Sequence, residues 1–161
     1  MFDTAFIGKV AGVIAFAAYV PYVLSIVRRK TDPNRVTWLI WAIVGLMLAV
    51  SYYYSGAVET MWVPIIYVIG PASIFLLSLK YGKSEWTRVD AGCLLGVAIS
   101  LVLWWVTGSA LTALLLNLLI DFFGAVPTIR KVYYEPGSED RFAWVISCAG
   151  SAVNLFAIED W

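Results

Sequence analysis

Residues 117–144 read NLLIDFFGAVPTIRKVYYEPGSEDRFAW. An apolar segment carries one carboxylate, Asp121, and reaches a proline, Pro127, six positions later. A short loop follows, first basic and then acidic, and a new apolar run opens at residue 142. This order predicts two apolar helices joined by a charged loop, with one ionisable side chain deep inside the first helix.

The same order occurs earlier in the chain, in residues 11–38, which read AGVIAFAAYVPYVLSIVRRKTDPNRVTW. An offset of 106 (127 − 21) superimposes the two segments from the proline to the tryptophan without a gap. The matched pairs are Pro21 with Pro127, Arg35 with Arg141 and Trp38 with Trp144. Three matches in one register indicate an internal repeat.

The composition favours a membrane protein. Of 161 residues, 61% are hydrophobic and 14% are charged, whereas soluble domains carry about 25% charged residues. The mean hydropathy is +0.83, and roughly 20 apolar residues span a bilayer. A net charge of zero gives no sign of a nucleic-acid partner. Histidine is absent and both cysteines fall in apolar runs, so we expect no metal, no cofactor and no enzymatic activity.

Apolar runs of near-spanning length predict six transmembrane helices, because backbone polar groups in lipid must be satisfied within the segment. The predicted helices cover residues 6–27, 36–54, 60–79, 91–106, 110–129 and 142–158.

The basic residues are distributed on one side of this topology. All of them except Lys9 fall in or beside the first, third and fifth loops, at residues 28–35, 80–88 and 130–141. The positive-inside rule makes these loops cytoplasmic. We therefore predict an integral protein of the plasma (inner) membrane with both termini on the non-cytoplasmic side.

The repeat divides the chain into a first three-helix repeat at residues 1–82, a linker helix at 83–107 and an incomplete second repeat at 108–161. At the same offset, the copy of the third helix would begin beyond Trp161. We expect either truncation of a seven-helix protein, which we favour, or a third helix supplied by a partner.

These residues resemble the PQ-loop superfamily, which includes the SWEET sugar transporters and the KDEL receptor. The shared pattern is a proline in the inner half of a helix, a short basic loop, and a helix that opens with a small or hydroxyl residue and an aromatic. The matching pairs are Pro21-Tyr22 with Thr37-Trp38, and Pro127-Thr128 with Ala143-Trp144. Neither copy carries the glutamine that gives the motif its name. The resemblance implies an all-α membrane protein with tandem parallel three-helix-bundle repeats, here 3+1+2, and a solute path between them.

Asp121 is the strongest candidate site residue. A charged side chain deep in a transmembrane segment costs free energy, and it usually faces a cavity or a partner. Asn117, Asp121, Gly124 and Thr128 share one face of a helix. In lipid, the carboxylate must be protonated, paired with a cation or hydrated, so it could couple transport to protons. The alternative is a structural hydrogen bond to Asn154 or a tyrosine.

The equivalent face of the first repeat carries Ala11, Ala15, Ala18 and Tyr22, with Tyr19 beside them. Small side chains that lead to a phenol could leave room for a sugar or another small polar solute. Close helix packing is the alternative, since an alanine face serves it equally well.

The remaining candidates are an amide, two indoles and two prolines. Asn154 could line the path, but a hydrogen bond between helices is the favoured interpretation. Trp41 could line the path, whereas Trp38 is expected to anchor at the membrane interface. Pro21 and Pro127 each remove a helix hydrogen bond and predict matched hinges, or else static kinks.

The leading hypothesis is a membrane transporter for a small polar solute, of the sugar or amino-acid class, that works by alternating access. The alternative is a membrane receptor of the same fold that does not transport. The expected partners are the solute, protons and the lipid bilayer, and the protein could form homo-oligomers.

Overall fold

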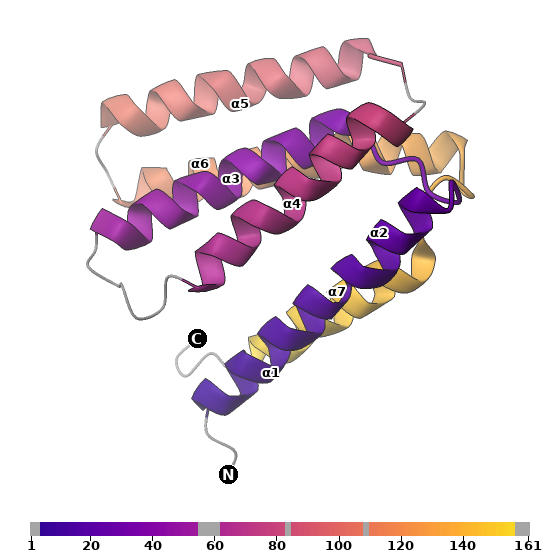
Figure 1. The fold of residues 1–161 in the computed structure, drawn as a ribbon. Coiled ribbons are helices and arrows are strands. Elements are labelled where there is room, and N and C mark those ends of the chain that lie inside the picture. The colour runs from indigo at the N-terminus through magenta and orange to yellow at the C-terminus, as the bar shows by residue number, and fades with distance from the viewer. Residues whose placement is uncertain (1–3, 55–61, 83–84, 108–109, 157–161) are drawn as a thin grey trace. The chain divides into compact units, whose positions relative to one another are not determined.

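The structure is a computed structural model that describes residues 4–54, 62–82, 85–107 and 110–156 (Figure 1). Within these ranges, all regular secondary structure is helical. The helices are α1 (Thr4–Ala17), α2 (Tyr19–Val27), α3 (Arg35–Tyr54), α4 (Trp62–Tyr81), α5 (Arg88–Thr107), α6 (Ala110–Tyr134) and α7 (Arg141–Leu155). Because α1 and α2 follow each other directly, the described residues form six helical segments, and this confirms the all-α prediction.

The predicted helix ends agree closely with the observed ones. The largest difference in the described chain is in α6, which continues past the expected end at residue 129 to Tyr134. The last turn of α6 is basic and aromatic, and these residues are good enough helix formers to extend an existing helix.

Two of the described helical segments are long and apolar enough to cross a membrane. They are Phe6–Val27, with a hydropathy of 2.1, and Arg88–Thr107, with a hydropathy of 2.0. Shorter apolar helices cover Arg35–Val50, Ile65–Tyr81 and Arg141–Val153.

The chain forms two compact units. Unit 1 contains Met1–Thr31 and Glu139–Trp161, and therefore holds α1, α2 and α7. Unit 2 is Asp32–Ser138 and holds α3 to α6. These units cut across the ranges 1–82, 83–107 and 108–161, and the division into those ranges stays a prediction.

In unit 1, the first helical segment packs along α7 (Figure 1). The closest approach is at Gly150, where an added Cβ would lie 2.8 Å from the backbone nitrogen of Ala15. A side chain at Gly150 would therefore force the two backbones apart. Ala11 and Ala18 are buried on the same helical segment, so small residues let α1 and α7 come close together.

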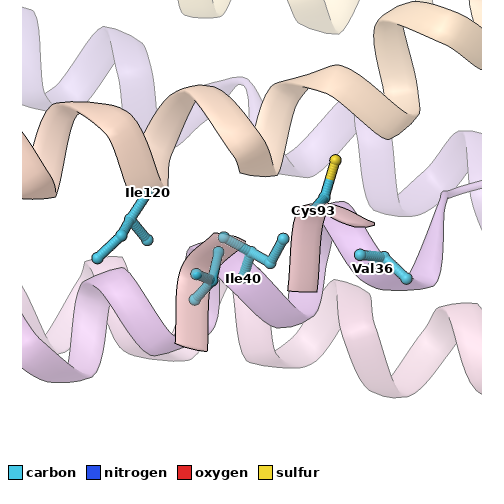
Figure 2. Close-up of a cluster of buried hydrophobic side chains, with 5 residues drawn as sticks. Val36, Ile40, Cys93 and Ile120 are labelled. Carbon is cyan, nitrogen blue, oxygen red and sulfur yellow. The ribbon is translucent and has the colours of Figure 1, made fainter. Parts of the chain in front are cut away.

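In unit 2, α3 packs against both α4 and α6, and α5 packs against α6 (Figure 1). A Cβ on Gly45 of α3 would meet the backbone carbonyl of Tyr67 in α4, so this contact also requires a bare backbone. Figure 2 shows the core between α3, α5 and α6. Its buried side chains are Val36, Ile40, Cys93, Val97 and Ile120.

Three helix starts are capped by side chains. The Asn34 Oδ1 accepts hydrogen bonds from the backbone nitrogens of Val36 (2.9 Å) and Thr37 (3.1 Å) at the start of α3. Asp140, at the equivalent repeat position, caps α7 by accepting from the Ala143 nitrogen at 2.9 Å. Side-chain oxygens of this kind satisfy backbone donors that the first helical turn leaves without a partner.

The α5 start has a reciprocal cap. Thr87 and Asp90 exchange hydrogen bonds, with the Thr87 nitrogen donating to Oδ2 of Asp90 at 2.7 Å and the Asp90 nitrogen donating to Oγ1 of Thr87 at 3.2 Å. This is the capping-box arrangement, in which each side chain satisfies the backbone donor of the other residue.

Candidate functional site

The polar face of α6 divides between the core and the surface of unit 2. Asn117, Asp121, Gly124 and Thr128 lie on one helix, as their spacing predicts. Gly124 and Thr128 are buried, Asn117 is half-buried and Asp121 is exposed. Thus Asp121 lies at the edge of the face that packs on α3, and its side chain is not part of the core of unit 2.

The indole of Trp41 occupies the space beside Gly124. Its Nε1 donates to the backbone carbonyl of Asp121 at 3.4 Å. An added Cβ on Gly124 would lie 2.7 Å from the same nitrogen. The space that a side chain at Gly124 would need is therefore filled by a side chain of α3. Trp41 and Asp121 are therefore brought together within unit 2.

The position of Trp38 differs from the sequence prediction. It was predicted to anchor at the membrane interface, but only 5% of it is exposed. Its ring makes an edge-to-face contact with Trp41, with centroids 5.1 Å apart. The Trp38 side chain is therefore packed against protein and is not at the protein surface.

Thr128 is paired with Thr37 across the α3–α6 contact. Its Oγ1 donates to Oγ1 of Thr37 at 2.9 Å, and both residues are buried. We call this pair the hydroxyl junction. It links the residue after Pro127 to the residue before Trp38.

The corresponding place in unit 1 contains a carboxylate. Tyr22, which follows Pro21, donates its hydroxyl to Oε2 of Glu139 at 2.6 Å. Trp144 donates its Nε1 to the same oxygen at 3.0 Å, and its ring meets the Tyr22 ring edge to face, with centroids 6.1 Å apart. We call these three residues the carboxylate junction. Glu139 is only 7% exposed.

Sequence reasoning did not select Glu139. At the repeat offset its counterpart is Pro33, so the comparison of the two copies gave no sign of a carboxylate there. The available signal was the position of Glu139 in the loop directly before the sixth predicted helix, five residues before Trp144.

The remaining candidate residues have varied surroundings. Tyr19 is half-buried and lies near Phe16, with ring centroids 6.2 Å apart. The alanine face beside it packs on α7 at Gly150, which favours the close-packing interpretation over open space in unit 1. Asn154 belongs to α7, but its side chain lies outside the described residues.

The two prolines act differently on their helices. Four residues before Pro21, α1 ends at Ala17, and α2 begins only after Ala18. A proline removes the hydrogen bond to the fourth preceding carbonyl and clashes with it, which explains an interruption at this point. The α6 helix continues without interruption through Pro127.

The described residues contain no group of three His, Cys, Asp or Glu side chains that could hold a metal ion. No protein-family model, curated protein or solved structure matches the chain.

Proposed function

We propose that the chain is an integral membrane transporter for a small polar solute, of the sugar or amino-acid class. In this proposal, transport proceeds by alternating access between two PQ-loop-like repeats and is linked to protons through Asp121. The predicted topology places the basic loops in the cytoplasm and both termini outside, in the plasma (inner) membrane.

One observation carries the proposal: the sequence repeat recurs in the side-chain contacts. In unit 1, the residue after the first proline, Tyr22, meets Trp144. In unit 2, the residue after the second proline, Thr128, bonds to Thr37 beside Trp38. Each contact joins the first helix of one copy to the second helix of the other. Internal structural repeats are a common feature of transporters.

The distribution of charge supports a membrane location. In the described part of unit 2, every charged residue except Asp121 lies near the start of α3 or α5 or the end of α4 or α6. Large hydrophobic side chains are exposed along the helices, such as Val13 (65%) on α1 and Leu95 (62%) on α5. Soluble monomers rarely expose apolar surface of this extent, whereas lipid chains would cover it without cost.

The position of Asp121 supports the proton link. The surrounding helix, from Ala110 to Ile120, has no other charged residue. A carboxylate at such a position in a membrane must be protonated, paired or hydrated. Because the Asp121 side chain is exposed on unit 2, it is accessible to a solute, a proton or another part of the protein.

The test is uptake by proteoliposomes that contain the purified chain, screened with sugars and amino acids with and without a pH gradient. We expect uptake of at least one solute, enhanced by a proton gradient. The variant Asp121→Asn keeps the shape of the side chain and should transport without response to the gradient. Glu135→Gln, which removes an exposed carboxylate just beyond α6, is the matched control and should respond as the parent does.

The outcomes separate the alternatives. A solute that binds the protein but is never taken up would support the receptor of the same fold instead. Transport by Asp121→Asn with an unchanged pH response would make Asp121 structural and remove the proton link. A topology reporter fused after Trp161 that is found on the cytoplasmic side would overturn the predicted topology.

A further inference from the structure

The ends of several helices of unit 2 meet at the N-terminal turn of α3. Arg35 donates from Nε to the Ser78 carbonyl (3.3 Å) and from Nη2 to the Gly82 carbonyl (2.8 Å), and so joins α3 to the end of α4. Asn34 donates to the Asp90 carboxylate at 3.4 Å and joins α3 to the start of α5. The hydroxyl junction joins α3 to the last third of α6. We call this end of the four helices the basic end of unit 2.

Two cations at the basic end, Lys80 and Arg130, lie over tyrosine rings. The Lys80 Nζ is 5.4 Å from the centroid of Tyr81 at the end of α4. The Arg130 guanidinium is 5.4 Å from the centroid of Tyr134 at the end of α6. Tyr133 stands edge to face against Tyr134, with centroids 5.2 Å apart. Each contact fixes a positive charge beside an amphipathic ring.

These groups are available to a ligand. Tyr133 is 79% exposed and Tyr134 is 69% exposed, and Lys80 and Arg130 are also exposed. Among the described residues, neither cation forms an ion pair with a carboxylate. The buried acid of this end, Asp90, is instead used to cap α5. Lys80 and Arg130 therefore lack an anionic partner among the described residues.

The opposite end of unit 2 has a different character. The described residues at the end of α5 and the start of α6 are uncharged. Trp105 (82%) and Val106 (69%) are highly exposed there. In the described part of unit 2, the basic residues therefore all lie at one end of the helices, together with the exposed tyrosines and the exposed carboxylates of Glu85 and Glu135.

We propose that the basic end of unit 2 binds the headgroups of anionic phospholipids in the cytoplasmic leaflet. Lys80 and Arg130 would contact the lipid phosphates, and the tyrosine rings would lie at the headgroup level. Tyrosine is enriched at this depth because its ring is apolar and its hydroxyl is polar. The inference rests on the proposed membrane location, but it does not depend on transport.

Charge complementarity determines the expected size of the effect. A lysine or arginine near an anionic membrane surface contributes about 1 kcal/mol, which corresponds to roughly fivefold in affinity. Each of Lys80→Gln and Arg130→Gln should weaken binding by about that factor, and the double variant should combine both losses.

The experiment is native mass spectrometry of the full chain in a neutral detergent, titrated with phosphatidylglycerol or phosphatidylcholine. We expect tighter binding of phosphatidylglycerol, losses of about fivefold for each single variant, and near-parental binding for Arg130→Lys. The matched control Lys9→Gln removes an exposed charge from α1 and should leave the affinity unchanged. Addition of inorganic phosphate should not displace the lipid, because the tyrosine rings also contact its glycerol and acyl region.

Equal affinity for the two lipids would overturn the proposal, as would equal losses in Arg130→Gln and Lys9→Gln. Displacement by inorganic phosphate would identify a general phosphate site instead and would also overturn it. Thermal unfolding midpoints of all variants establish that each is folded. Because binding is measured without transport, failure of this proposal leaves the uptake experiment unaffected, and the reverse also holds.

Discussion

The carboxylate junction of unit 1 and the hydroxyl junction of unit 2 occupy corresponding places in the repeat but differ in chemistry. Tyr22 and Trp144 donate to one buried carboxylate oxygen of Glu139. At the matching place, Thr37 and Thr128 share a single neutral hydrogen bond. The two contacts join corresponding helices of the repeat. Their contributions to stability depend on the side chains present at each junction.

The difference in chemistry predicts which junction is more sensitive to the removal of a side chain. A buried donor without an acceptor pays its full desolvation penalty, while removal of both partners of a neutral pair is nearly neutral. Removal of Glu139 would take a shared acceptor from two donors, whereas removal of either threonine would take one partner from one hydroxyl. The carboxylate junction should therefore respond more strongly to substitution.

The largest effect is expected for Glu139→Ala. Loss of the carboxylate removes the acceptor that the Tyr22 hydroxyl and the Trp144 indole nitrogen share, and we expect a loss of about 3 kcal/mol in the free energy of unfolding. Denaturant unfolding in detergent, followed by tryptophan fluorescence, measures it.

The control is Glu139→Gln, which keeps an acceptor oxygen and should lose only about 1 kcal/mol. If the alanine and glutamine variants are equally stable, the hydrogen bonds to Tyr22 and Trp144 contribute nothing, and the comparison of the two junctions fails.

The helices could be predicted from the sequence because the apolar runs are long and end near charged loops. The grouping of these helices into units could not be predicted. Most of the helices are apolar on several sides, so no single stripe identifies the neighbouring helix. That information lies in details such as the bare backbones of Gly45 and Gly150, which allow contact with particular partners.

The candidate site was predictable to a similar degree. The spacing of Asn117, Asp121, Gly124 and Thr128 correctly indicated a shared face of α6. It could not indicate that Trp41 would fill the place beside Gly124. Glu139 was missed because its burial depends on Tyr22, which is 117 positions away in the chain.

A smaller effect is expected at the hydroxyl junction. Thr128→Val keeps the shape of the side chain and strands one buried hydroxyl, so we expect a loss of about 1 kcal/mol. The double variant Thr37→Val with Thr128→Val should be no less stable than either single variant, because no hydroxyl is then left without a partner. A double-mutant cycle from unfolding midpoints measures the coupling. Additive losses would show that the two hydroxyls do not interact.

Effects of a similar size are expected at the matched helix caps, which sharpen the comparison because Asn34 and Asp140 occupy equivalent repeat positions. Removal of a capping side chain costs about 1 kcal/mol. Asn34 accepts from two backbone nitrogens and also donates to Asp90, whereas Asp140 accepts from the Ala143 nitrogen. Asn34→Ala should therefore be more destabilising than Asp140→Ala in thermal unfolding. Asn34→Ser restores an acceptor without the amide donor, and its stability should lie between those of the parent and Asn34→Ala. A larger loss of stability for Asp140→Ala than for Asn34→Ala would contradict this prediction. It would mean that the number of hydrogen bonds made by the capping side chain does not determine how much the cap stabilises the protein.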